Sequence, residues 1–168
     1  VAFAPDARYV LSGSHARAHL WDARRGQEQR RFEGHQGGVS AVAVSPDGRF
    51  VLTGSVDATV RLWDLHGNEV RRFTGHDKQV TSVAFAPDGR TALSAGFDKT
   101  VRLWDVASGR ELRTLRGHDG EVFCVGFAPD GRSAISGSQD YAIHVWDPTP
   151  GGGDRPRRTF QGRHNYVN

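Results

Sequence analysis

A repeat of roughly 40 residues runs through the chain and constrains its fold more than any other feature. Trp-Asp pairs begin at four nearly evenly spaced positions, Trp21, Trp63, Trp104 and Trp146. Gly-His pairs precede the last three, at His35, His76 and His118, and the offset from the His to its Trp is the same in each case. Three identical offsets indicate that one structural unit is repeated along the chain.

The second unit shows how each repeat divides into four short strands. Small and branched apolar residues predict strands over residues 39–44 and 50–55, joined by the turn Ser45-Pro46-Asp47-Gly48. Further strands are predicted over residues 59–64 and 69–73, with a turn at residues 56–58 between the second and third strands. Because no stretch has helical periodicity, we expect an all-β protein.

Four antiparallel strands per unit, with Gly-His and Trp-Asp at this spacing, resemble the WD40 family of β-propellers. The resemblance covers essentially the whole chain. It implies four blades of four antiparallel strands each, packed face to face in an open or partial ring, since family members usually close with about seven blades. The expected blades are approximately residues 1–34, 35–75, 76–117 and 118–164, and residues 165–168 start a further inner strand.

A His, a hydroxyl residue and an Asp recur at fixed offsets before three of the Trp residues. The sets are His35, Thr53, Asp57 and Trp63; His76, Ser94, Asp98 and Trp104; and His118, Ser136, Asp140 and Trp146. Taken alone, such a set suggests the acyl-transfer chemistry of a Ser-His-Asp triad. One set per repeat, Thr in place of Ser in one of them, and the absence of a strand-to-helix elbow argue against catalysis.

The family resemblance implies a structural role for these sets. The Trp indole N–H and the hydroxyl would reach the His, and the Asp would hold the other ring nitrogen, so that each buried polar group has a partner. The first unit departs from this pattern, because only Ser12 and Trp21 match it and Ala7 stands in a hairpin where the other units have Gly. We expect the first blade to be the least stable, with the most altered loop between its second and third strands.

Composition and motif spacing exclude several other classes of function. Cys124 is the only cysteine, so no intrachain disulfide forms, and we expect its thiol to be inert core. The His residues lie about one unit apart, too dispersed for a zinc motif, so we expect no metal and no cofactor. No apolar run is long enough to span a bilayer and no signal peptide is visible, which favours a cytoplasmic protein without a membrane partner. The chain lacks Met and opens at Val1 within a strand-like run, so we expect it to be part of a longer protein.

The resemblance also implies where partners bind. Family members most often bind on the rim where the loops between blades and the loops between second and third strands cluster. The candidate residues there are Val56, Lys78, Gln79, Phe97, Glu121 and Gln139. An aromatic residue in an otherwise polar turn makes Phe97 either a partner anchor or a contact with the neighbouring blade, and the sequence leaves both readings open.

The positive charge is almost all arginine and recurs in the outer strands. The net charge is +3, and the recurrent residues are Arg30, Arg31, Arg71, Arg72, Arg113, Arg116, Arg157 and Arg158. Such rows could bind an acidic partner or nucleic acid. They also protect exposed strands from edge-to-edge aggregation, which is the interpretation we favour.

These observations predict a non-catalytic scaffold that binds other proteins or peptides. The Arg-rich, self-similar repeats resemble bacterial members of the family, which favours a regulatory or sensory segment of a larger signalling protein. The alternatives are nucleic-acid or acidic-partner binding through the arginine rows, which the acidic residues among them disfavour, and a hydrolase using a His/Ser/Asp set.

The two ends of the chain suggest how four blades could close. Residues 162–168 followed by residues 1–6 resemble residues 117–130, about one residue short. We therefore consider that two copies pair into an eight-bladed ring with two-fold symmetry. The alternative is that the missing blades lie in a longer parent chain.

Overall fold

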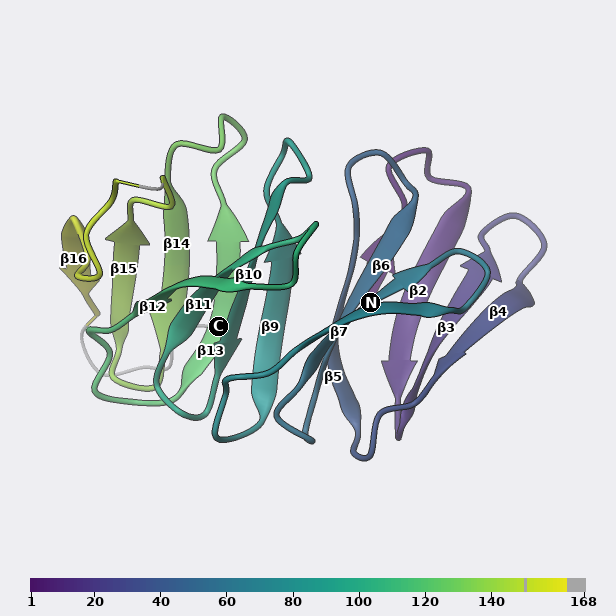
Figure 1. The fold of residues 1–168 in the computed structure, drawn as a ribbon, viewed down its shortest axis with the longest axis horizontal. Helices are drawn as coiled ribbons and strands as arrows, with labels where there is room; N and C mark the ends of the chain where they lie inside the picture. Colours follow the sequence, from purple (N-terminus) through teal and green to yellow (C-terminus); the bar gives the residue numbers. More distant parts are fainter. Residues whose placement is uncertain (150, 163–168) are drawn as a thin grey trace.

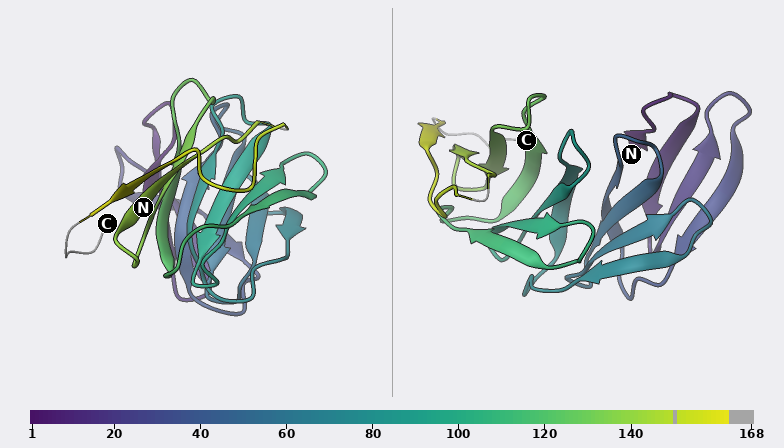
Figure 2. Two further views of the ribbon diagram at one scale, coloured as in Figure 1. Left: turned by 90° about the vertical axis from the view of Figure 1, so that its left-hand side faces the viewer. Right: turned by 45° about the horizontal axis from the view of Figure 1, so that its top comes forward.

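A computed structural model describes residues 1–149 and 151–162, and within them every regular element is a β-strand. The strands form four antiparallel sheets, each built from four strands consecutive in sequence. We call these sheets blades 1 to 4. Figure 1 shows them side by side in chain order, and the right-hand view of Figure 2 shows that they form an open arc. The predicted all-β fold of four four-stranded blades in an open ring is therefore confirmed.

The strands have the following bounds. Blade 1 contains β1 (Ala2–Phe3), β2 (Tyr9–Ser14), β3 (Arg17–Asp22) and β4 (Gln27–Glu33). Blade 2 contains β5 (Val39–Val44), β6 (Phe50–Ser55), β7 (Val60–Asp64) and β8 (Glu69–Phe73). Blade 3 contains β9 (Val80–Phe85), β10 (Thr91–Gly96), β11 (Val101–Asp105) and β12 (Glu111–Leu115). Blade 4 contains β13 (Val122–Phe127), β14 (Ala134–Ser138), β15 (Ala142–Trp146) and β16 (Arg158–Gln161).

Blade 2 follows the expected strands closely. β5, β6 and β8 have the predicted bounds, whereas β7 begins one residue later than expected, at Val60. The reason is that Thr59 belongs to the turn, where its amide and its hydroxyl both donate to Asp57 Oδ1, at 2.9 and 2.6 Å. The expected further inner strand at residues 165–168 lies outside the described residues.

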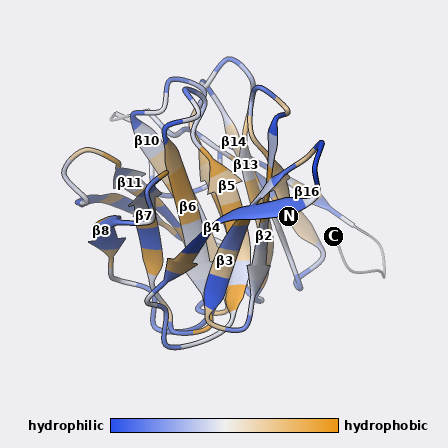
Figure 3. Cartoon of the chain, turned by 90° about the vertical axis from the view of Figure 1, so that its right-hand side faces the viewer, coloured by the Kyte–Doolittle hydropathy of each residue, from blue (hydrophilic) through white to orange (hydrophobic). Residues whose placement is uncertain are grey.

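The hydrophobic core is divided among the junctions between blades. At each junction, apolar residues of the second, third and fourth strands of one blade pack against the inner strand and the Trp of the next. Between blades 2 and 3 the buried set includes Leu52, Val60, Leu62, Phe73, Val80, Ala92 and Trp104. Both faces of blades 2 and 3 are buried in this way, and the outer strands are polar: Figure 3 colours β4 hydrophilic and β5 hydrophobic.

The hairpins between first and second strands explain the recurrent Pro-Asp-Gly sequence. Gly48, Gly89 and Gly131 close these turns with φ values of 70°, 69° and 69°. In blade 1 the equivalent residue is Ala7, with φ of 55°. An L-residue in this left-handed region is strained by about 1–2 kcal/mol. At this hairpin blade 1 therefore carries a cost that blades 2 to 4 avoid, whereas those blades hold a left-handed L-residue in the turn after their second strand, at Ala58, Lys99 and Tyr141.

Candidate functional site

The four side chains predicted to act together in blade 2 form one continuous hydrogen-bond chain. The indole N–H of Trp63 donates to Thr53 Oγ1 at 2.9 Å, and this hydroxyl lies 2.7 Å from His35 Nε2. His35 Nδ1 lies 2.9 Å from Asp57 Oδ2. The expected bond from the indole to the imidazole is therefore replaced by a bond from the indole to the hydroxyl. The order along the hydrogen-bond chain is Trp, hydroxyl, His, Asp.

The same arrangement recurs in blades 3 and 4. The indole-to-hydroxyl distance is 2.8 Å in both, for Trp104 with Ser94 and for Trp146 with Ser136. The hydroxyl-to-Nε2 distance is 2.7 Å in both. Nδ1 lies 2.8 Å from Asp98 in blade 3 and 2.9 Å from Asp140 in blade 4. We call each of these four-residue sets a tetrad.

The electrostatics fix the proton positions in the blade 2 tetrad. Burial lowers the pKa of His35 below its usual value and outweighs the opposing effect of Asp57. Burial alone would raise the pKa of Asp57, but hydrogen bonds from Thr59, the Gln36 amide and His35 hold that pKa well below its usual range. A neutral imidazole beside an ionised carboxylate carries its proton on Nδ1, so Nε2 accepts from the Thr53 hydroxyl.

This geometry resembles a catalytic triad but is closed to a substrate. The Ser94 and Ser136 side chains are fully buried, and each hydroxyl already lies between an indole and an imidazole. A nucleophile has to be approached by the carbonyl that it attacks. The tetrads therefore satisfy buried polar groups in the folded protein.

Each tetrad Asp also holds two loops at the same end of its blade. In blade 2, Asp57 Oδ2 accepts from the amide of Gln36 in the loop that enters the blade, at 2.9 Å. The turn that follows β6 is tied to this loop by a bond from Val56 N to Gly38 O, at 2.9 Å. Bonds from Phe97 N to Gln79 O and from Gln139 N to Glu121 O repeat this link at 2.9 and 2.8 Å. We call this end of the molecule the tetrad end.

The six residues predicted to bind a partner lie in these paired loops. The side chains of Val56, Lys78 and Gln139 are exposed, and Val56 is 51% exposed. Gln79 and Glu121 are half-buried. Phe97 is also half-buried, and its ring meets the edge of Phe123 in the next blade, with centroids 6.2 Å apart. The structure thus shows the contact with the neighbouring blade that was one of the two readings for Phe97.

Blade 1 has a reduced version of this arrangement. The Trp21 indole donates to Ser12 Oγ at 2.8 Å, but both side chains are only half-buried. An imidazole is supplied by His19 of β3, whose ring nitrogens contact Ser14 at 3.1 Å and Glu28 at 3.2 Å. β2 ends at Ser14 and β3 begins at Arg17, so the loop at this point has shrunk to a two-residue turn.

Sequence reasoning missed a buried arginine beside two of the tetrads. Arg61 is 2% exposed, and its guanidinium contacts Glu69 at 2.8 Å and Asp57 at 3.6 Å. Arg102 occupies the same place in blade 3, with Glu111 at 2.6 Å and Asp98 at 3.7 Å. The signal that could have found them is the recurrence of Arg two residues before Trp and of Glu six or seven residues after it.

Blade 4 replaces this arginine with His144, and this substitution creates a candidate metal site within the described part of the chain. Ligand atoms of His118, Asp140 and His144 lie within 4.8 Å of one another, and the buried His144 Nε2 has no hydrogen-bond partner among the described residues. However, both ring nitrogens of His118 already have partners in the tetrad. The two imidazoles are also stacked, with centroids 3.9 Å apart, so their in-plane lone pairs are nearly parallel and do not converge on one ion.

Several arginines of the outer-strand rows are engaged within the protein. Arg31 and Arg72 form ion pairs with Glu28 and Glu69. Arg71 of blade 2 donates to Ala107 O in the β11–β12 turn of blade 3, at 3.0 and 3.1 Å. Arg113 of blade 3 reaches the corresponding turn of blade 4, where it donates to Asp147 O and Thr149 O at 2.8 and 3.0 Å. Arg71 and Arg113 thus fasten one blade to the next.

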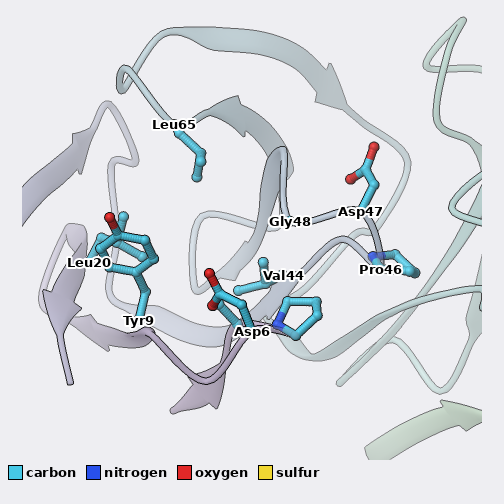
Figure 4. Close-up of a pocket in the computed structure, with 10 residues that line it drawn as sticks. Asp6, Tyr9, Leu20, Val44, Pro46, Asp47, Gly48 and Leu65 are labelled. Carbon is cyan, nitrogen blue, oxygen red and sulfur yellow. The ribbon is translucent and has the colours of Figure 1, made fainter. Parts of the chain in front are cut away.

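A small pocket opens between blades 1 and 2, beside the hairpins that join their first and second strands (Figure 4). It measures about 190 Å³ and is lined by the hairpins around Asp6 and Asp47, with Tyr9, Leu20 and Leu65 on its walls. Its lining combines apolar side chains with the two aspartates. No tetrad residue lines this pocket, so it is separate from the loops of the tetrad end.

Comparison with known families supports the repeat assignment. A family model described as "WD domain, G-beta repeat" matches the chain three times, over residues 26–64, 67–105 and 109–147. A search of curated proteins found no match. No helix long and apolar enough to cross a membrane occurs in the described part of the chain. Cys124 is a free, half-buried thiol.

Proposed function

The chain belongs to the WD40 family, and from this premise we propose that it is a non-catalytic platform that binds other proteins or peptides through the loops of its tetrad end. WD40 repeats generally mediate protein–protein interactions, and the domains are typically non-enzymatic scaffolds. The candidate contact residues are those predicted from the sequence, and Val56, Lys78 and Gln139 are the exposed ones among them.

One observation carries this proposal: the same hydrogen bonds hold three loop pairs that display different side chains. In each of blades 2 to 4, a buried tetrad ends at an Asp that bonds the entering loop, and the adjacent turn bonds the same loop through its backbone. The side chain displayed just before that Asp is Val56, Phe97 or Gln139. A rigid frame that presents varied chemistry suits recognition of a specific partner, because little conformational entropy is lost on binding.

The tetrads themselves favour this reading over the hydrolase alternative. Their hydroxyls are buried and each makes two hydrogen bonds, one with an indole and one with an imidazole. The set occurs once in each of three blades. A hydrolase needs one accessible nucleophile beside an oxyanion site.

The charges favour a protein partner over nucleic acid. Arg31 and Arg72 have carboxylate partners, and Arg71 and Arg113 are bonded to neighbouring turns. A phosphate backbone is bound by arginines that are free to replace its counterions. We retain within the proposal a cytoplasmic location, supported by the single free thiol, and a regulatory or sensory role in a larger bacterial signalling protein, supported by the self-similar, Arg-rich repeats.

Selection of peptide ligands on the immobilised chain tests the proposal. We expect selected peptides to bind the wild-type chain and to lose roughly tenfold in affinity on Val56→Glu, a change at the tetrad end. Leu112→Glu is the matched control, because Leu112 is an aliphatic residue of similar exposure, 46%, on outer strand β12. Peptides that respond to Leu112→Glu and ignore Val56→Glu would contradict the assignment of the binding surface.

A covalent probe tests the absence of serine chemistry. We expect a serine-directed fluorophosphonate to leave the folded chain unlabelled. Labelling of Ser94 or Ser136, identified by peptide mass spectrometry, would overturn the non-catalytic reading and restore the hydrolase alternative.

A further inference from the structure

A cavity of about 680 Å³ opens where the outer part of blade 4 meets the segment that enters it from blade 3. The amide of Arg116 in this segment donates to Asp154 O, in the loop before β16, at 3.0 Å and ties the two walls of the cavity together. The cavity is lined by Arg116, Gly117, His144, Asp154, Arg155, Pro156 and Thr159.

An ion pair fills the corresponding space in blades 2 and 3. In blade 3 the guanidinium of Arg102 and the carboxylate of Glu111 meet beneath Gly75, the Gly of the Gly-His pair. A Cβ on Gly75 would lie 2.6 Å from Arg102 Nη1 and 2.8 Å from Glu111 Oε2. Arg61 and Glu69 form the same pair in blade 2, at 2.8 Å. In both blades charged side chains therefore occupy the place under this Gly.

Blade 4 has neither member of this ion pair. Strand pairing puts His144 at the position of the arginine and Pro156 at the position of the glutamate. A Cβ on Gly117 would lie 3.0 Å from Pro156 Cδ and 3.4 Å from His144 Nε2, so these two side chains border the same place under the Gly. Both are shorter than the residues that they replace, which leaves room for the cavity.

One ring nitrogen of His144 is left without a partner in the wall of this cavity. His144 is 5% exposed, and its Nδ1 lies 3.0 Å from the Thr159 hydroxyl. Its Nε2 faces Gly117 and has no hydrogen-bond partner among the described residues. When Nδ1 accepts from the Thr159 hydroxyl, Nε2 carries the proton and is a donor. A buried donor without an acceptor is unfavourable, so an acceptor that a ligand supplies here is favoured.

The free charge around the cavity is positive. The side chains of Arg116 and Arg155 are exposed and make no hydrogen bond or ion pair within the part of the chain that the structure describes. The carboxylate in the lining, Asp154, is already paired with Arg113 at 3.0 Å. Two guanidinium groups and an imidazole nitrogen thus line one cavity with no free carboxylate among its described residues to balance them.

We propose that this cavity binds a phosphate group, with Arg116 and Arg155 as its cationic ligands and His144 as the donor in its inner wall. A phosphate monoester carries close to two negative charges and three acceptor oxygens. It therefore matches two guanidinium groups, each of which can bind phosphate oxygens through two parallel N–H groups. A carboxylate carries a single charge and would leave one guanidinium without a counter-charge. The site is separate from the six candidate contact residues of the tetrad end, because none of them lines the cavity.

Imidazole signals in ¹H–¹⁵N spectra of the wild-type chain test the proposal directly. Inorganic phosphate, added at constant pH and ionic strength, should shift the ring signals of His144 in a saturable way. The ring signals of His35 and His76, which lie in the tetrads of other blades, should stay in place. Failure of phosphate to move the His144 signals, or equal shifts at all three imidazoles, would overturn the proposal.

A phosphoserine peptide identifies the source of the phosphate group. Saturation of the His144 shift at a lower concentration of this peptide than of inorganic phosphate assigns the site to a phosphorylated partner, and the reverse order assigns it to the free ion. Both outcomes support a phosphate site. The unphosphorylated peptide should leave the His144 signals unchanged, and an equal response to both peptides would contradict recognition of phosphate.

A single substitution tests the cationic ligands. Arg155→Ala should raise the dissociation constant for phosphate roughly tenfold, because a charge-assisted contact is lost from an exposed loop position. Arg132→Ala is the matched control, since Arg132 is an exposed arginine of the same blade, in the β13–β14 hairpin, and does not line the cavity. Equal effects of these two variants would reduce the binding to general charge attraction and overturn the proposed site.

A double substitution tests the role of the vacated space. His144→Arg combined with Pro156→Glu gives blade 4 the ion pair of blades 2 and 3, and should abolish phosphate binding although it adds an arginine. The variant copies an arrangement that this chain already contains twice, and circular dichroism checks that it keeps the β-sheet spectrum of the wild type. Phosphate binding of wild-type strength in the folded double variant would show that the cavity is not the site.

Discussion

Blades 1 and 3 share one fold but satisfy their polar groups differently. In blade 3 the Ser94 hydroxyl links Trp104 to His76, and all three side chains are buried. In blade 1 the Ser12–Trp21 bond is present, but both residues are half-buried and no tetrad Asp follows. Both blades nevertheless form complete four-stranded sheets. The comparison indicates that strand pairing and apolar packing form the blade, while the tetrad stabilises it and orders the loops at one end.

The largest difference between these blades should appear when the Trp is removed. Trp104→Ala empties a fully buried position between blades 2 and 3, and we expect a loss of about 3–5 kcal/mol in the free energy of unfolding. Trp21→Ala should cost less than half as much, because Trp21 is half-buried. Urea denaturation followed by circular dichroism measures both. Equal losses would show that blade 1 is packed as tightly as blade 3.

Removal of the hydroxyl sharpens the comparison. Ser94→Ala leaves the buried Trp104 N–H and His76 Nε2 without partners, and we expect a loss of about 1–3 kcal/mol. Ser12→Ala leaves only the half-buried Trp21 N–H, which water can reach, and should cost well below about 1 kcal/mol. The same denaturation experiment applies, and a larger loss for Ser12→Ala would contradict the structural role of the complete tetrad.

The hairpin of blade 1 offers a change in the opposite direction. Ala7→Gly relieves the left-handed conformation at φ of 55° and should stabilise the protein by about 0.5–1 kcal/mol, since part of the gain is offset by the freer unfolded chain. The reverse change in blade 2, Gly48→Ala, should destabilise by a similar amount, because a Cβ there meets open space and only the backbone is strained. Thermal unfolding measures the shift of the unfolding midpoint for both variants. A lower midpoint for Ala7→Gly would show that Ala7 is not strained.

The smallest expected effect is a gradual loss of stability in mild acid. The pKa values of His35 and His118 are lowered by burial from the ordinary value of 6.5, so the folded state binds fewer protons than the unfolded state below that pH. Stability should therefore be constant above about pH 6.5 and fall gradually below it. A second, steeper fall in stability is expected below about pH 3.8. The pKa values of Asp57 and Asp98 are lowered in the folded protein, so the unfolded state again binds more protons than the folded state there. Thermal unfolding across this range checks both, and a rise in stability between pH 6.5 and 5 would contradict buried, neutral imidazoles.

The repeat made most of the fold predictable. The three identical His-to-Trp offsets and the Pro-Asp-Gly turns were enough to predict four blades and the strands of blade 2 to within one residue. These features are local, so a single sequence displays them. The hydrogen bond from indole to hydroxyl, in place of indole to imidazole, depends on how the side chains are oriented, and spacing carries no information about that.

The contacts made across blades could not be predicted in the same way. Arg71 and Ala107 lie 36 residues apart and meet because neighbouring sheets pack at a fixed angle, which no local pattern encodes. The same applies to the stacking of His118 on His144, where blade 4 replaces the arginine of blades 2 and 3. Phe97 shows most clearly why contacts between blades escape prediction from a single sequence, because its neighbour Phe123 belongs to the next repeat.

Hydrogen exchange at the four indole N–H groups tests the central claim, that the tetrads are internal bonding groups of packed blades. A ¹H–¹⁵N spectrum recorded after transfer to D₂O resolves one signal for each Trp. The indoles of Trp63, Trp104 and Trp146 are buried and bonded to buried hydroxyls, so their signals should persist long after that of half-buried Trp21 has gone. Rapid, equal exchange of all four signals in the folded protein would contradict the account.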